Sequence, residues 1–325
     1  MIFNGSDNLR FPFLQYEIQR AGEGAGNTEN LVRLFSTVQE IMSRRTGNGG
    51  DQYWQSACQQ LMRNTIDLCI LAVGEVTVWM MSEVVRSAPK SIEEKQSKEW
   101  REKSLCWKLL EKAYGNDLGR WEELDLNTIA SYWMEEYPSI SDKTRSGIVS
   151  MFTSLIDPLL RRPFRMLFSE PPENPEQIAY PELTHHGMII VMDLSVKEYG
   201  DAGRMSQLIY KYMWQQAAER RDIKDNPRPI FLWADEAQNF VTDYDMHFQA
   251  TARSSRACTV YLTQNLPNLF SELGNRDRVH SLVGNLQTKI WHANSDPETN
   301  NFACEVIGKS WQQRSGQSQS FGGQS

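Results

Sequence analysis

The chain lacks the features of several protein classes. No stretch reaches the roughly 18 consecutive apolar residues that a membrane-spanning helix needs. The nearest candidate, Ile66 to Met81, is interrupted by Asp67 and Glu75. The first residues, MIFNGSDNLRF, contain no basic region followed by an apolar core, so we expect no secretory signal in them. The sequence therefore predicts no membrane span within this chain.

Cysteine and histidine patterns typical of metal sites are also missing. The five cysteines are odd in number and form no CxxC pair, which argues against a zinc site and against a disulfide framework. We expect all five to be buried thiols. His185 and His186 are adjacent, and no spaced carboxylate or cysteine joins them, so the sequence favours a turn there over a metal site.

Positive charge is scarce. The net charge is -7 and the isoelectric point lies near 5.4, which argues against the broad basic surface that dominates non-specific DNA binding. Any nucleic-acid contact must then be local. The candidates are Arg44-Arg45 and the run LLRRPFR at residues 159–165, although such clusters are more often only solvated.

The pattern of apolar residues changes near residue 180. Apolar residues recur at helical spacing up to about residue 168, and they predict helices at about 27–46, 52–73, 94–114, 127–136 and 144–160. A proline-rich segment at residues 171–181 marks a boundary. Beyond it, apolar runs at 188–194, 230–234, 259–263 and 288–292 alternate with helical stretches at about 204–221, 246–253, 278–285 and 298–307. This alternation predicts an α/β fold with a parallel sheet covered on both faces.

Two carboxylates follow one of these apolar runs. Ile230 to Ala234 is typical of a strand buried on both faces, and Asp235 and Glu236 come directly after it. The carboxyl end of a strand is where ligands bind in open α/β sheets. In phosphate-hydrolysing enzymes one such acid holds Mg²⁺ and its neighbour orients the attacking water. Acids in the first turn of a helix are the alternative, since they oppose its dipole.

Two further polar features point to the same chemistry. The run Cys258 to Leu262 is followed by Gln264, whose amide would lie at the carboxyl end of a neighbouring strand and contact a γ-phosphate. Between the two runs, Arg253 and Arg256 are three residues apart, so on a helix they share one face. An arginine there would reach a phosphate in a neighbouring subunit. A solvated helix end is the alternative for either arginine.

Several segments resemble the TraD/TraG type coupling ATPases of conjugative type IV secretion systems. They are TENLVRLF, DKTRSGIVSMF, GMIIVMDLSVKEYGDAGR, RPIFLWADEAQNF, ATARSSRACTVYLTQN and NLQTKIWHANSDPETN, and the resemblance is strongest from Arg228 to Asn265. It implies a RecA-like motor domain interrupted by an all-helical domain. It also implies a homo-hexameric ring on the cytoplasmic face of the bacterial inner membrane, which hands single-stranded or double-stranded DNA bound to a relaxase and other relaxosome proteins to the secretion channel.

The resemblance also assigns roles to individual residues. Asp235 and Glu236 match the Walker B acids, with Asp235 holding Mg²⁺ through water and Glu236 serving in catalysis. Gln264 matches the strand-end sensor of bound ATP, and Arg253 matches the arginine that completes a neighbour's site.

One departure from the family is large. Phosphate binding needs GxxxxGK[ST] between a strand and a helix, and no such element lies between Met1 and Asn27. The near match ACEVIGKS, at 303–310, begins with Ala and follows a predicted helix that Gly308 closes. In the family, the phosphate loop precedes the region where this chain begins, so we expect half of an ATP site and no ATPase activity of the chain alone.

With this departure the resemblance implies four parts. They are a remnant of the N-terminal half of the motor domain (1–26), the all-helical domain (27–178), the C-terminal half of a partial RecA-like ATPase domain (179–308) and a flexible tail rich in Gln, Ser and Gly (309–325). Three functions stay open. One is a DNA-pumping coupling ATPase, the second is a non-catalytic adaptor that binds relaxosome or substrate proteins through its helical domain, and the third is another DNA-translocating ring ATPase.

Overall fold

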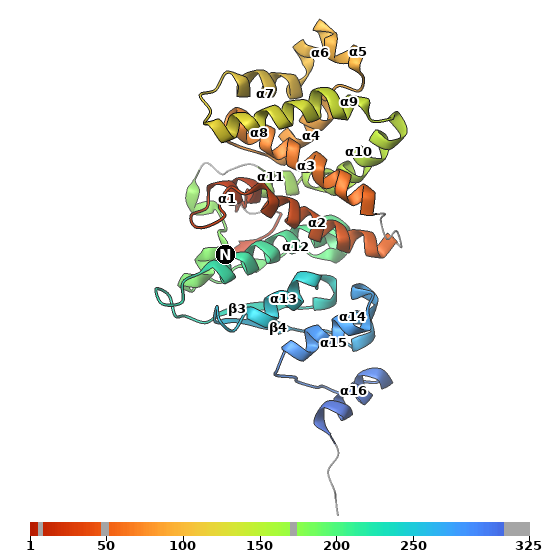
Figure 1. Ribbon diagram of the computed structural model, residues 1–325. Coiled ribbons are helices and arrows are strands. Elements are labelled where there is room, and N and C mark those ends of the chain that lie inside the picture. Colours follow the sequence, from red (N-terminus) through yellow and green to blue (C-terminus); the bar gives the residue numbers. More distant parts are fainter. Residues whose placement is uncertain (6–8, 47–51, 170–173, 309–325) are drawn as a thin grey trace, which may run out of the picture.

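The computed structural model describes residues 1–5, 9–46, 52–169 and 174–308, and it is rich in helices. The helices of the first half are α1 (Phe13–Gln19), α2 (Thr28–Thr46), α3 (Gln52–Val73), α4 (Val78–Ser87), α5 (Ile92–Gln96), α6 (Lys98–Lys103), α7 (Leu105–Tyr114), α8 (Arg120–Ser131), α9 (Tyr137–Ser139), α10 (Asp142–Ile156) and α11 (Phe164–Phe168). In Figure 1 the helices α3 to α10 form one end of the molecule. The predicted tail 309–325 and the side chains of Arg44 and Arg45 lie outside the described residues.

The stretch predicted to be helical over 94–114 is confirmed as helical, but it forms the three helices α5, α6 and α7 and not one. A serine begins each of them. The hydroxyl oxygens of Ser91, Ser97 and Ser104 accept hydrogen bonds from backbone N–H groups three residues later, at 3.1, 3.4 and 3.1 Å. Such caps satisfy an otherwise unpaired donor at the start of a helix. Ser97 and Ser104 also end the preceding helix, so the stretch is divided at these two residues.

Helix α4 was not predicted, and it follows α3 after a sharp turn. Gly74 provides the turn with a φ of +72°, and Thr77 caps α4 by accepting a hydrogen bond from the N–H of Met80 at 3.1 Å. No single helix in the described ranges is long and apolar enough to cross a membrane. The pair α3 and α4 passes that test on length and composition only when taken together, and it is bent by 107° at the break.

Three of the four described strands lie in the second half. Its elements are β2 (Val191–Met192), α12 (Val196–Arg220), β3 (Ile230–Ala234), α13 (Asp243–Thr251), β4 (Ala257–Tyr261), α14 (Leu266–Leu273), α15 (Arg276–Asn285) and α16 (Pro297–Ile307), and β1 (Ile2–Phe3) pairs with β2. The described strands form two parallel pairs, β1-β2 and β3-β4. The fold is therefore a mixed one, mostly helical with two small parallel sheets.

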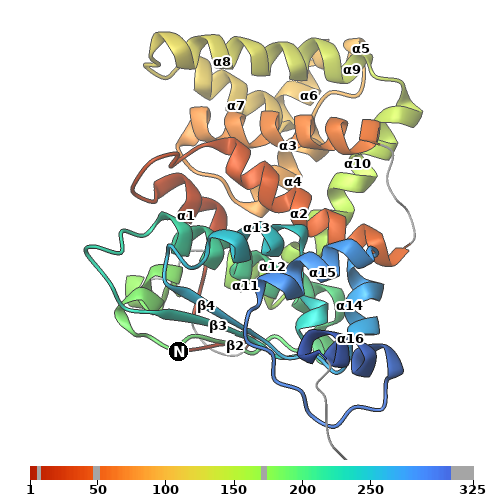
Figure 2. The same ribbon diagram turned by 60° about the horizontal axis from the view of Figure 1, so that its bottom comes forward.

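Two strand predictions differ from the structure. The run 188–194 contributes only the two residues of β2, which pairs with β1. A cavity of about 780 Å³ is lined by residues of this segment and of β3. Figure 2 shows β2, β3 and β4 in the same part of the molecule. The run 288–292 contains no strand within the described chain and has no regular secondary structure. Apolar character alone did not reveal whether a neighbouring strand would be in reach.

Strand β3 has the predicted bounds but not the predicted burial. Ile230 and Leu232 pack with Trp214 of α12 and Phe248 of α13. The alternate residues Phe231 and Trp233 are 55% and 66% exposed. The prediction of burial on both faces is wrong, because α12 and α13 cover one face of the β3-β4 pair and the other face is open to solvent.

Candidate functional site

The predicted acids lie where β3 ends. Asp235 is exposed and follows the last strand residue, and its carboxylate accepts a hydrogen bond from the N–H of Glu236 at 2.9 Å. Glu236 has left-handed backbone angles, with φ +48° and ψ +46°. This conformation is uncommon for a residue other than glycine and costs about 1 kcal/mol or more. It turns the chain out of the strand at once, so the side chain of Glu236 is held at the edge of the sheet.

The helix-dipole alternative for these acids has no support in the geometry. The next described α-helix, α13, begins only at Asp243. Between them lies the short 3₁₀ helix Ala237–Asn239, and the carbonyl of Glu236 accepts from the backbone N–H of Asn239 at 2.9 Å and from its side-chain amide at 3.2 Å. Asp235 and Glu236 therefore lie outside the first turn of an α-helix.

Gln264 meets Glu236 directly. The side-chain N–H of Gln264 donates to Oε1 of Glu236 at 2.9 Å, although 28 residues separate them in the chain. The parallel register explains the contact: Ala234 pairs with Tyr261, so both strands end at the same edge. A backbone hydrogen bond of 2.8 Å from Ala237 to the carbonyl of Leu262 joins the two chain segments just beyond that edge.

A second amide fixes the other oxygen of Glu236. The side chain of Gln238 donates to Oε2 of Glu236, and its own oxygen accepts from the hydroxyl of Thr263 at 2.8 Å. Both carboxylate oxygens are therefore oriented by amides, while Asp235 and Gln264 are exposed and Glu236 is half-buried. Sequence reasoning missed Gln238 and Thr263, although both flank predicted site residues.

The chain after Gln264 is also anchored. Asn265 caps α14 by accepting from the N–H of Asn268 at 2.9 Å, and Asn294 donates to the carbonyl of Gln264 at 2.7 Å. We did not predict α14, although Asn265 followed by Pro267 is a helix-start signal. The turn that carries Gln264 is therefore held between a helix start and a distant loop.

Arg204 contacts segments next to the site. The sequence did not predict this role. This buried arginine of α12 donates to the side-chain oxygen of Asn239 at 2.6 Å and to the carboxylate of Glu272 at 3.1 Å. It joins α12 to the 3₁₀ helix after Glu236 and to α14. No local sequence pattern predicts this arginine, because its partners lie 35 and 68 residues away in the chain.

Arg253 is not brought to the acids within one chain. The prediction that Arg253 and Arg256 share a helix face is wrong, because α13 ends at Thr251 and both arginines lie in the turn before β4. The N–H of Arg256 donates to the carbonyl of Arg253 at 3.1 Å, and the φ of Arg256 is +50°. This turn lies at the amino end of β4, about 16 Å of strand from the end that carries Glu236. A role of Arg253 in a neighbour's site stays a prediction.

The donors at this edge suit a hydrated ion better than a protein-only metal centre. Among the described residues, no group of three or more His, Cys, Asp or Glu side chains is placed to hold a metal ion. Asp235 offers one exposed carboxylate, and Mg²⁺ is commonly bound by one or two carboxylates together with water and phosphate oxygens. Asp235 therefore fits Mg²⁺ only where a nucleotide supplies further ligands.

The near match to a phosphate loop has the wrong surroundings. Residues 303–307 form the last turns of α16, and Gly308 closes that helix with a φ of +83°. A phosphate loop instead runs from a strand into the start of a helix. The predicted helix closed by Gly308 is confirmed. In this segment the helix precedes the glycine, whereas in a phosphate loop the helix follows it.

The prediction that all cysteines are buried is wrong for two of them. Cys58, Cys69 and Cys106 are buried in the helical core, whereas Cys258 and Cys304 are exposed. Cys258 points to the open face of the β3-β4 pair, which was expected to be covered. All five are free thiols.

A comparison with known protein families gives a match that contains the predicted site residues. Residues 229–325 match the model of a protein family described as the TraM recognition site of TraD and TraG. The match begins at the residue before β3, so it includes Asp235, Glu236, Arg253 and Gln264. A search of curated proteins and a search of solved structures gave no match. The family match supports the assignment of this chain to the TraD/TraG-type coupling proteins.

Proposed function

We propose that this chain serves conjugation as a coupling protein that recognises the relaxosome and carries the hydrolytic half of a magnesium-ATP site, which drives DNA into a type IV secretion channel. The observation that supports the ATPase part is the contact of Gln264 with Glu236 at the end of β3, beside Asp235. As in the family, six copies would form a ring at the cytoplasmic face of the inner membrane, and the β3-β4 pair would belong to a RecA-like sheet.

Each side chain has a defined task in this proposal. Asp235 would hold Mg²⁺ through water, and the ion would offset charge on the phosphates. Glu236, with both oxygens fixed by amides, would orient the attacking water and accept its proton. Gln264 donates to Glu236 and reaches solvent, so it is placed to exchange this partner for a phosphate oxygen and thereby to respond to bound ATP.

Relaxosome recognition rests on the family description. It names TraM recognition, and the matching residues are 229–325. We therefore assign TraM contact to this C-terminal part, whereas the helical domain, residues 27–178, has no such support. Contacts with the relaxase, with DNA and with channel components follow from the proposed role.

A non-catalytic adaptor is the second candidate. It is favoured by the sequence itself, which contains no GxxxxGK[ST] between a strand and a helix. As an adaptor the chain would bind TraM and would not bind ATP.

Two measurements test these proposals. The full chain is mixed with TraM of the same conjugative element, and cross-links are mapped by mass spectrometry. We expect them at residues 229–325, and cross-links confined to 27–178 would contradict the assignment. ATP binding by calorimetry and ATP hydrolysis by phosphate release are then measured for the chain alone and together with a polypeptide that supplies a phosphate loop. Hydrolysis that appears only in the second case supports the half-site, and its absence in both cases supports the adaptor.

A further inference from the structure

A second cavity lies near the amino end of β3, away from the acids: Arg221, which lines it, donates to the carbonyl of Arg228, two residues before the strand. It has a volume of about 570 Å³ and lies between α1, the 3₁₀ helix Pro181–His186 and the C-terminal end of α12. Arg20, Arg220, Arg221 and His185 line it together with apolar side chains such as Ile178 and Ala217. Small-molecule sites have this size and this mixture of apolar wall and few polar groups.

Several hydrogen-bond donors of this cavity have no protein partner. His185 is only 6% exposed, and its Nε2 has no hydrogen-bond partner among the described residues. The same holds for Nε and Nη1 of Arg221, both of which are buried. Among the described residues, only Nη2 of Arg221 has hydrogen-bond partners: it donates to the carbonyl of Asn226 at 3.0 Å and to the carbonyl of Arg228, two residues before β3, at 2.5 Å. Buried donors without partners are costly and rare in folded proteins, so these groups call for an acceptor.

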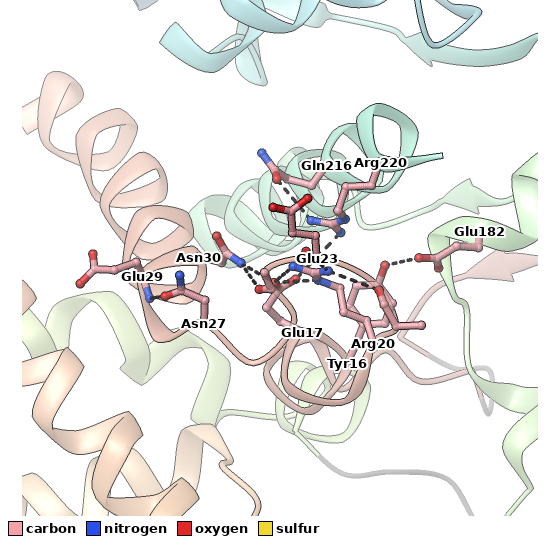
Figure 3. Close-up of polar contacts among 12 residues, drawn as sticks. Tyr16, Glu17, Arg20, Glu23, Asn27, Glu29, Asn30, Glu182, Gln216 and Arg220 are labelled. Carbon is pink, nitrogen blue, oxygen red and sulfur yellow. Dashed lines mark hydrogen bonds and ion pairs between the residues drawn. The ribbon is translucent and has the colours of Figure 1, made fainter. Parts of the chain in front are cut away.

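The nearby carboxylates are already engaged. Glu17 is buried and accepts from Arg20 at 2.8 Å and from Asn30 at 2.7 Å, and Arg220 lies 4.0 Å from it. Glu182 accepts from the hydroxyl of Tyr16 (Figure 3). These contacts leave Arg221 without a carboxylate partner in the described structure.

The surroundings of Arg221 carry positive charge in excess. Burial and then the charge of Arg256 lower the pKa of Arg221. Burial, Arg221 and His186 together lower the pKa of His185 to about 4. Both shifts indicate a partly desolvated region in which cations repel one another, and an anion would relieve that repulsion.

We propose that this cavity binds the phosphate group of a small soluble phosphate ester between Arg221, His185 and Arg220. A doubly charged phosphate balances the excess of guanidinium groups, and its oxygens accept from donors on several sides. The ester group would lie against Ile178 and Ala217. Because the cavity lies at the amino end of β3 and Asp235 at its carboxyl end, this site is separate from the proposed nucleotide site, and its test does not depend on that proposal.

Titration of the full chain with phenyl phosphate, inorganic phosphate and benzoate tests the site. Calorimetry should show saturable binding of phenyl phosphate, weaker binding of inorganic phosphate and the weakest binding of benzoate, which carries the same ring on a carboxylate. Arg221→Gln should weaken phenyl phosphate binding by about tenfold or more, as expected for the loss of a charged hydrogen-bond partner. Arg161→Gln is the matched control. It removes the same charge from an exposed ion pair with Asp157 and should bind like the wild type.

A second readout guards against misfolded variants. Phosphate should raise the pKa of His185 in the wild-type chain, measured by NMR of the imidazole and assigned with His185→Gln. Equal affinity of wild type and Arg221→Gln, tighter binding of benzoate than of phenyl phosphate, or an unchanged His185 titration would each overturn the proposal.

Discussion

Lys211 of α12 and Asp245 of α13 form an ion pair in the interior of the protein, with side chains 6% and 0% exposed. Asp245 also accepts hydrogen bonds from Gln215 at 2.8 Å, from the hydroxyl of Tyr261 at 2.5 Å and from the N–H of Thr242 at 2.6 Å. One carboxylate therefore joins α12, the start of α13 and the end of β4. This network fixes the strand end from which the chain continues to Gln264.

Asp245→Asn should destabilise the fold strongly, because it leaves the Lys211 ammonium buried without its counter-charge. We expect the free energy of unfolding to fall by about 3–5 kcal/mol, measured by urea denaturation followed by circular dichroism. The double variant Lys211→Met with Asp245→Leu removes both charges and should cost less than the sum of the two single changes. A single variant as stable as the wild type would contradict a structural role of the pair.

The same pair should make stability sensitive to acid. Burial by itself would raise the pKa of Asp245, but Lys211 and the hydrogen bonds outweigh it and hold the pKa below its ordinary value. A depressed folded-state pKa contributes stability above the unfolded value of about 4, and this contribution is lost as the pH falls through the folded value. Unfolding free energies measured from pH 6 downward should fall less steeply for the double variant than for the wild type. Parallel curves for the two proteins would contradict this prediction.

Glu236→Gln should separate ATP binding from ATP hydrolysis in a protein that joins this chain to a phosphate loop. The variant keeps the shape of the side chain and loses the charge that orients water, so kcat should fall by about a hundredfold or more with ATP affinity retained. Turnover and nucleotide binding are measured separately. Glu305→Gln, the same change on an exposed position of α16, is the control. Near-normal turnover of Glu236→Gln would refute the assigned role.

Gln264→Ala should have a smaller effect. It removes one of the two amide donors to the Glu236 carboxylate and leaves that of Gln238, so kcat should fall by only about two- to tenfold. Its ATP affinity reports separately on contact with the nucleotide. A variant unchanged in both kcat and ATP affinity would remove Gln264 from the site.

Arg253 and Glu236 lie at opposite ends of the β3-β4 pair, so any joint action requires two copies of the chain. Arg253→Ala rings and Glu236→Gln rings should both be inactive. Mixed rings should regain part of the ATPase rate, because some interfaces then contain both native residues. The rate is measured as the two variants are combined in changing proportion. No recovery at any proportion, or full activity of Arg253→Ala alone, would contradict a role across subunits.

Cysteine reactivity tests the packing of the two halves. Burial is the largest cause that raises the pKa values of Cys58, Cys69 and Cys106, so these thiols should resist alkylation in the native protein. Cys258 and Cys304 are exposed and should react readily. Mass spectrometry after iodoacetamide treatment should find label on these two alone, and on all five after denaturation. Rapid labelling of Cys106 in the native chain would mean that the helical core is less closed than described.

The sequence predicted best where the signal is local. The run 230–234 gave the bounds of β3, and α3 has its predicted limits, because apolar spacing decides both. The meeting of Glu236 and Gln264 also followed from sequence, since parallel strands end at a common edge. The turn that holds Arg253 was missed because helix length depends on where α13 finds packing partners. The Lys211-Asp245 pair and the cavity at Arg221 depend on contacts between distant segments, which no local pattern encodes.

The open face of β3 has a practical consequence. The aromatic rings of Phe231 and Trp233 are exposed to solvent, as is the thiol of Cys258 on the neighbouring strand. Exposed aromatic side chains on a short pair of strands promote aggregation, which leads to precipitation or irregular oligomers during purification. Purification of this polypeptide should therefore require a low protein concentration and a reducing agent, or co-expression with a protein that covers these two rings.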